Sequence, residues 1–406
     1  MSQGGVPEAL RGVVQAGLDR QEASDWVGAA QAWKSLQRAA HEQGHAALEL
    51  DAWVRLADVL RRADQPRQAL QALENGLAAD PDPVQRSLLL IQSSALLLDT
   101  GHLLSAEARV RAVLDHSEGP LRSMALDTLA ATLAIRGDRL GLGEVVLELE
   151  NMGPGPGALA ARFRRARLER LEGHLDACEV TLAALADSLS NKPKATGAVA
   201  AAITQLAQLA LLRGRFQDAE LLLRAADEGW EDCGRYVGRL EVLALRAELA
   251  TQRGALTFLP GWLDKGVAYA AEREMVLLEA RLRGVRGACR SMAGSETGHA
   301  DLDSALLLAE RAGAPFLSGR LRLERARLGF GEQGRPVVTL DVECALEELT
   351  GDRIWAARAR VLLAKLLLDK GQNAQGLEHA AAALCQFKAS GLEFDEGQAR
   401  KVLDRS

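Results

Sequence analysis

The chain has 406 residues, of which 48% are hydrophobic but only 4% aromatic, and its formal net charge at pH 7 is −6. This modest negative charge argues against a general nucleic-acid binder, which needs a basic footprint. The opening residues lack the basic and apolar regions of a signal peptide, and no run reaches the roughly 18 apolar residues of a membrane span. We therefore expect a cytoplasmic protein without a membrane partner.

Ala and Leu supply most of the apolar packing, and β-branched residues are sparse. No stretch alternates apolar with polar residues over the length of a strand, so a sheet has little support. Five cysteines are scattered without a Cys-x-x-Cys pair, which indicates neither a disulfide framework nor a metal site. We expect an all-α chain in which the cysteines are buried small residues.

The first elements set the pattern for the rest of the chain. Pro7 and Glu8 favour a helix over about residues 7–21, and a second helix should end near Gly44. From Trp53 the spacing of large and small residues predicts a pair of closely packed helices. The residues with this spacing form an apolar stripe on each helix. They are Trp53, Leu56, Ala57 and Leu60 on the first helix and Ala69, Leu73 and Gly76 on the second, which stops at Pro81.

Turn residues recur along the whole chain at intervals of 36–41 residues. Glycine is favoured at a helix end because it adopts positive φ without a Cβ clash, so glycines in one phase predict regular helix ends. Ten helix hairpins follow from this repeat. The turn residues are Asp25, Asp64, Gly101, Gly137, Gly173, Gly214, Gly254, Gly294, Gly334 and Gly371.

The stripe between Trp53 and Pro81 resembles the tetratricopeptide consensus, with repeats longer than the familiar 34 residues. The resemblance implies a right-handed α-solenoid of about ten hairpins, forming a single superhelical domain over residues 1–406. A Gly/Pro-rich stretch within 151–157 predicts a loop or a hinge. A short polar helix near 395–404 is expected to cap the last apolar face.

One stretch matches a catalytic signature, because His41-Glu42-Gln43-Gly44-His45 has the H-E-x-x-H spacing of a zinc metalloprotease. Gly44 stands where the repeat should end a helix, so we expect the two histidines to lie on either side of a break. No phosphate-binding loop and no nucleophile elbow occurs in the chain. We expect no enzyme activity, no metal and no cofactor.

Arginine is concentrated in several of the expected first helices, which in tetratricopeptide proteins line the concave groove. Guanidinium groups bind carboxylates or phosphates through two parallel hydrogen bonds, which favours an acidic peptide as the partner. The alternative is a solvated face whose arginines pair with neighbouring acidic residues. The candidate partner-binding residues are Phe163, Arg164, Arg167, Arg170, Arg281 and Arg325.

The function that these features favour is a non-catalytic scaffold that holds a protein or peptide partner in a concave groove. An alternative is the effector- or partner-sensing arm of a bacterial regulatory system, since similar lengthened repeats occur in bacterial regulators. A zinc metalloprotease using His41, Glu42 and His45 is a more remote alternative.

Overall fold

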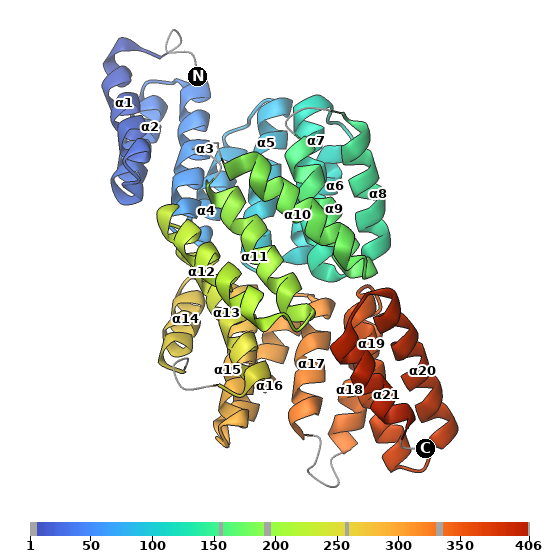
Figure 1. Cartoon of the computed structure of the whole chain (residues 1–406). Coiled ribbons are helices and arrows are strands. Elements are labelled where there is room, and N and C mark those ends of the chain that lie inside the picture. The colour runs from blue at the N-terminus through green and yellow to red at the C-terminus, as the bar shows by residue number, and fades with distance from the viewer. Residues whose placement is uncertain (1–5, 154–156, 191–195, 256–259, 330–335, 405–406) are drawn as a thin grey trace. The chain divides into compact units, whose positions relative to one another are not determined.

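The structure is a computed structural model that describes all residues except 1–5, 154–156, 191–195, 256–259, 330–335 and 405–406. The described residues form 21 α-helices and no strand (Figure 1), which confirms the predicted all-α class. None of the helices in these ranges is both long enough and apolar enough to cross a membrane.

The helices of the first half are α1 (Glu8–Glu22), α2 (Trp26–Glu42), α3 (Ala46–Arg62), α4 (Pro66–Ala78), α5 (Pro83–Asp99), α6 (Leu103–Leu114), α7 (Gly119–Arg136), α8 (Arg139–Asn151), α9 (Ala158–Glu172) and α10 (Leu175–Ser190). Those of the second half are α11 (Thr196–Leu212), α12 (Phe216–Asp232), α13 (Tyr236–Arg253), α14 (Pro260–Glu272), α15 (Val276–Met292), α16 (Thr297–Arg311), α17 (Pro315–Gly329), α18 (Pro336–Glu348), α19 (Arg353–Asp369), α20 (Asn373–Ala389) and α21 (Glu393–Leu403).

The chain packs as two compact units. The first unit contains Met1–Thr128 together with Ala271–Met275, and the second contains Leu129–Ala270 together with Val276–Ser406. The boundary after Thr128 falls inside α7. One superhelical domain over the whole chain stays a prediction.

The core of the first unit contains the apolar stripe that the sequence predicted. Leu56 and Leu60 on α3 are at most 4% exposed, and Ala69 and Leu73 on α4 are fully buried. Gly76 on α4 is also buried, and a Cβ there would lie 3.3–3.4 Å from side-chain atoms of Leu50, Trp53 and Leu89. The small residues therefore let α4 pack closely against its neighbours, as the spacing predicted.

The helix ends also follow the predicted repeat. Seven of the eight turn glycines have positive φ, and the eighth, Gly334, lies outside the described residues. At the first turn the residue with positive φ is Ser24, while Asp25 caps α2 by accepting a hydrogen bond from the backbone N–H of Gly28. The seven glycines are Gly101, Gly137, Gly173, Gly214, Gly254, Gly294 and Gly371.

In chain order, α1 to α20 correspond to the ten predicted hairpins, and α21 lies where a cap was predicted, while its capping role stays a prediction. Helix α21 packs against α20 and α19, where Ala399 and Val402 are at most 1% exposed beside the buried Phe387. The stretch predicted as a loop or hinge separates α8 from α9, and its residues 154–156 lie outside the described part of the chain. The choice between loop and hinge therefore stays a prediction.

The second unit closes on itself, because α9 packs against α19 (Figure 1). The backbones of Gly137 and Gly351 approach so closely that a Cβ on Gly351 would lie 1.7 Å from the carbonyl oxygen of Gly137. Gly173, with φ of +80°, ends α9 where a Cβ would lie 2.5 Å from the Oγ of Ser390. The backbone contact requires glycine at 351, and the positive φ favours glycine at 173; both contacts join hairpins that are distant in sequence.

The prediction that the cysteines are buried holds for two of them and is wrong for one. Cys178 and Cys289 are buried, and burial raises the pKa of Cys178 to about 12 and that of Cys289 to about 11. Cys385 is exposed because the buried side of α20 is formed by Ala380, Ala383 and other residues that Cys385 does not adjoin on the helix.

We predict that Val402→Asp destabilises the second unit by roughly 3 kcal/mol or more, because it places an unpaired carboxylate in a buried apolar site. Lys401→Asp is the matched control, since Lys401 is exposed on the same helix. Thermal unfolding followed by circular dichroism measures both effects. Equal melting temperatures for the two variants would contradict the capping role of α21.

Candidate functional site

The second unit contains a cavity of about 470 Å³ on the side formed by the first helices of its hairpins. Most of its lining residues come from α11, α13, α15, α17 and α19, and α12, α20 and α21 contribute the others. Apolar residues such as Leu317, Leu321 and Val361 line part of it, and Phe394 of α21 stands at its edge with 67% of its surface exposed. This placement matches the expectation that the first helices line the groove.

Three arginines occupy equivalent positions along this cavity. Arg281 on α15, Arg320 on α17 and Arg358 on α19 are 39 and 38 residues apart, which is one repeat in each case. The guanidinium of Arg320 lies 4.3 Å and that of Arg358 lies 4.8 Å from the ring centre of Trp355. Arg358 also binds Asp395 of α21 through two hydrogen bonds of 3.0 and 2.8 Å. The cavity wall therefore combines aromatic and cationic surface.

Glu248 on α13 links two of these arginines. Its carboxylate lies 3.3 Å from Arg320 and 3.5 Å from Arg281, and Arg281 also pairs with Glu241. Burial alone would raise the pKa of Glu248, but the charges of Arg320 and Arg281 outweigh burial and lower it. Burial likewise opposes the charge of Arg281, whose pKa is nevertheless raised by Glu241 and Glu248. This end of the cavity is held together by complementary charges.

Arg170 of α9 makes the buried ion pair that closes the second unit. Its Nη1 donates a 2.9 Å hydrogen bond to Asp352, and the side chains of the two residues are 5% and 0% exposed. Asp352 also caps α19 by accepting from the backbone N–H groups of Ile354 and Trp355. The guanidinium of Arg170 lies 5.7 Å from the ring centre of Phe316. One carboxylate therefore both starts α19 and joins it to α9.

Arg167 lies one helical turn before Arg170 and is half-buried. It makes neither a hydrogen bond nor an ion pair with any residue that the structure describes. Burial is the main cause that lowers the pKa of Arg167 well below its ordinary value, and the charges of Arg170, Arg281 and Arg320 add to this effect. A guanidinium stays protonated in proteins, so the direction of this shift reports the cost of holding its charge there.

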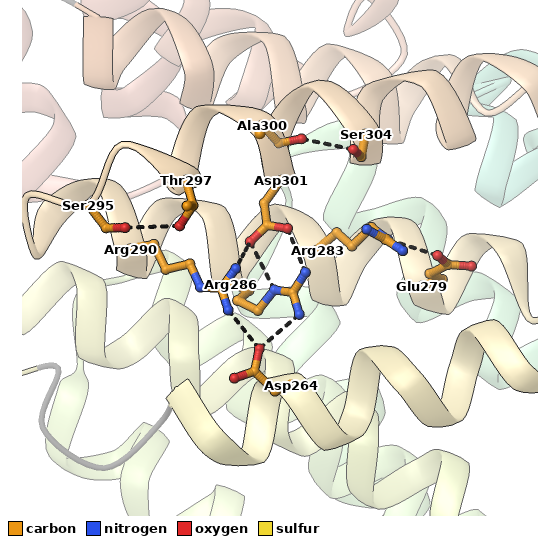
Figure 2. Close-up of polar contacts among 10 residues, drawn as sticks. All are labelled: Asp264, Glu279, Arg283, Arg286, Arg290, Ser295, Thr297, Ala300, Asp301 and Ser304. Carbon is orange, nitrogen blue, oxygen red and sulfur yellow. Dashed lines mark hydrogen bonds and ion pairs between the residues drawn. The ribbon is translucent and has the colours of Figure 1, made fainter.

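Other arginines of the first helices bind aspartates on the second helices at either side. Figure 2 shows Arg286 and Arg290 of α15 between Asp301 of α16 and Asp264 of α14, with hydrogen bonds of 2.5–2.9 Å. One repeat later, Arg325 of α17 binds Asp341 of α18 and Asp303 of α16 in the same way. We call this repeated arrangement the arginine ladder.

The ladder accounts for Arg325, one of the candidate partner-binding residues. Two hydrogen bonds to Asp341, together with Asp303, raise its pKa. Phe163 is half-buried and packs against Leu185, Leu189 and Ala202. Arg164 is half-buried on α9. The structure therefore brings Arg167, Arg170 and Arg281 into one charged region and places Arg325 in the ladder.

The two histidines of the H-E-x-x-H string lie on either side of a helix break, as predicted. His41 belongs to α2, Gly44 has φ of +72°, and His45 is the residue that precedes α3. The side chain of His41 is 72% exposed, and its Nδ1 lies 3.0 Å from Glu49. The described ranges contain no group of three or more His, Cys, Asp or Glu side chains able to hold a metal ion.

Comparison with known proteins identifies the fold. No family model and no curated protein sequence matches the chain. A solved structure of a Rap protein complexed with Competence and Sporulation Factor is similar, with a TM-score of 0.52 and 11% identity over 79% of this chain and 97% of that chain. This chain has a tetratricopeptide-like repeat fold.

Two further structures resemble this tetratricopeptide-like chain less closely. A tetratricopeptide repeat protein from Parabacteroides merdae has a TM-score of 0.36 and 14% identity over 84% of this chain and 100% of that chain. The apo form of RapI has a TM-score of 0.41 and 11% identity over 79% of this chain and 96% of that chain.

Several residues of this site are absent from the candidates named from the sequence, namely Glu248, Arg320, Asp352, Trp355, Arg358 and Phe394. A signal for two of them was present, because Arg281, Arg320 and Arg358 recur at the repeat interval. No periodic signal points to Asp352, whose partner Arg170 is 182 residues away.

We predict that Asp352→Asn lowers the stability of the second unit by roughly 3–5 kcal/mol, because it leaves the buried charge of Arg170 uncompensated. Asparagine still accepts hydrogen bonds at a helix start, so the cap of α19 is retained. The double variant Arg170→Met with Asp352→Asn should recover part of the loss. Arg224→Gln, in an exposed pair with Glu220, is a control that should change the melting temperature little.

Glu248→Gln should cost about 1.5–3 kcal/mol at pH 7, because it removes charge-assisted contacts to Arg281 and Arg320. The pKa of Glu248 in the folded protein lies below its ordinary value of 4.5. The stabilisation is therefore fully present above pH 4.5 and is lost as the pH falls through the lower, folded-state pKa. Melting temperatures of wild type and variant should converge in that acidic range, and a difference independent of pH would contradict this assignment.

Proposed function

We propose that this protein is a non-catalytic scaffold whose cavity in the second unit binds a segment of another protein. The cavity lined by the first helices is the observation that carries the proposal. A volume of about 470 Å³ is within the range of ligand pockets, roughly 300–1,000 Å³, and is too small for a folded domain. It suits an extended segment that inserts one or two side chains.

The lining supports a segment with both apolar and acidic side chains. Leu317, Leu321 and Val361 offer apolar contact. Trp355 offers an aromatic ring, and the guanidinium of Arg320 lies over that ring. Arg320 has a lowered pKa, mainly because of burial, with Arg281 and Arg170 adding repulsion. An acidic group entering this region offsets that repulsion, so we infer an acidic protein or peptide segment as the partner.

A second candidate function is the effector- or partner-sensing arm of a bacterial regulatory system. The similar Rap structure is a complex with Competence and Sporulation Factor, which supports the use of this fold to hold a partner. In this chain α21 contributes Phe394, Asp395 and Gln398 to the cavity wall, so occupancy would act directly on the terminal helix. A change in protease sensitivity of α21 on partner binding would favour this candidate.

Val285→Glu tests the groove, because Val285 lines the cavity and a carboxylate there both disrupts apolar contact and repels an acidic segment. Val180→Glu is the matched control, since Val180 is 69% exposed on the second helix α10. Partners captured from the native cell by wild type should bind Val285→Glu at least tenfold more weakly, which is about 1.4 kcal/mol.

Capture and titration by calorimetry or fluorescence measure this effect, and circular dichroism confirms that both variants are folded. The control should bind as wild type does. Unchanged binding by Val285→Glu would contradict the assignment of the partner to this cavity.

A further inference from the structure

Helix α21 has an open face that points away from its contacts with α19 and α20. The buried residues of this helix are Asp395, Ala399 and Val402. On the open face, Phe394 is 67% exposed, and a Cβ on Gly397 would have no heavy atom within 4 Å. The helix therefore presents an aromatic side chain and uncovered backbone to the solvent.

The same positions are covered on the preceding first helix. Helix α21 starts 40 residues after α19, so Phe394 corresponds to Ile354 and Gly397 corresponds to Ala357. Ile354 is fully buried and Ala357 is 2% exposed, and both belong to a core cluster that includes Phe387 of α20. A second helix therefore covers on α19 the positions that are open on α21. By this comparison, the open face has the shape that receives a further helix.

The charges on the open face of α21 are complementary to themselves. Glu393 is exposed and makes neither a hydrogen bond nor an ion pair with any residue that the structure describes. Arg400 pairs with Glu396 of its own helix, and 58% of its side chain stays exposed. Glu393, Gly397 and Arg400 stand at positions i, i+4 and i+7, which lie on one side of an α-helix. A negative charge therefore precedes Gly397 by about one turn, and a positive charge follows it by nearly the same distance.

We propose that the open face of α21 binds α21 of a second copy of this chain in an antiparallel pair. In a two-fold symmetric interface the same patch of both copies is used, so each contact occurs twice. When the two helices cross at Gly397, Glu393 of each copy faces Arg400 of the other. Gly397 lets the two backbones approach closely, and Phe394 is covered at the flank of the contact. The proposal goes beyond the proposed function and does not depend on it.

The size of the face sets the strength of this pairing. A standard interface buries about 800 Å² on each partner, and a single helix of 11 residues offers less than that. We therefore expect a reversible dimer with a dissociation constant on the order of 0.1–1 mM. Association of this kind depends on protein concentration and on salt, because its charged contacts are exposed.

Sedimentation velocity of the full chain tests the proposal, at concentrations from about 10 µM to 1 mM that span the expected weak range. The mean mass of wild type should rise from monomer towards dimer, and less so in high salt. Glu393→Arg and Arg400→Glu should each weaken association roughly fivefold or more, because each places two pairs of like charges across the interface. Glu343→Arg is the matched control, since Glu343 is exposed on α18, and it should associate as wild type does.

Mixing the two single variants separates a contact between copies from an effect on α21 itself. In a dimer of Glu393→Arg with Arg400→Glu, opposite charges face each other at both contacts. The equimolar mixture should therefore associate about as strongly as wild type, although neither variant does so alone. The double variant carrying both changes should also associate as wild type does. Circular dichroism melting at low concentration confirms that every variant is folded.

Two results would overturn the proposal. One is a wild-type chain that stays monomeric over the whole concentration range, in which case a helix of a different protein becomes the candidate to cover this face. The other is a mixture of the two single variants that associates no more strongly than either variant alone. The proposed partner-binding function is tested separately by Val285→Glu, because the sedimentation experiments involve no other protein.

Discussion

The buried ion pair between Arg170 and Asp352 is the interaction on which the second unit depends. A helical repeat protein normally gains its stability from contacts between neighbouring repeats. Here one side chain of α9 crosses to the start of α19, 182 residues further along the chain. Helix α19 also contributes Trp355 and Arg358 to the cavity wall, so the pair holds the start of a helix that lines the cavity. Removing Asp352 would leave the buried charge of Arg170 without another carboxylate partner among the described residues.

The arginines of this protein serve two different purposes, and position within the repeat separates them. Arg286 and Arg325 belong to the arginine ladder, where each binds aspartates from the second helices on either side. Arg281 and Arg320 stand five residues earlier in the same helices and point to the cavity. Five residues on an α-helix correspond to a rotation of about 140°, which places the two sets on different faces. An arginine-rich helix can therefore be both a structural tie and part of a binding surface.

The fold was predictable from the sequence because its signals are local and repeated. Turn glycines such as Gly101 and Gly214 occur in one phase, and the small residues Ala69 and Gly76 allow close helix packing. Ten hairpins and a cap follow from such nearest-neighbour information. The closure was not predictable in this way. Its partners, Arg170 and Asp352, belong to hairpins that are distant in the chain and are in contact only through α9 and α19.

The candidate site shows the same division between local and long-range information. Arg167, Arg170 and Arg281 were identified from the sequence because arginine is concentrated in their helices, but the same reasoning also selected Arg325. Local density of arginine does not reveal which side chains already have carboxylate partners. That distinction depends on Asp303 and Asp341 in neighbouring helices, and on the absence of such a partner for Arg167 within the described residues.

The composition of the cavity wall explains why charge, rather than apolar area alone, should decide what binds there. Arg320 and Arg358 both lie within 5 Å of the ring centre of Trp355, so the aromatic surface is flanked by fixed positive charge. Asp395 offsets the charge of Arg358, and Glu248 is shared between Arg281 and Arg320. A neutral apolar segment gains the contacts with Leu317 and Leu321 but leaves the repulsion of Arg320 by Arg281 and Arg170 unchanged. An acidic segment gains the same apolar contacts and also reduces this repulsion. Its advantage over a neutral segment is largest where burial limits screening by salt.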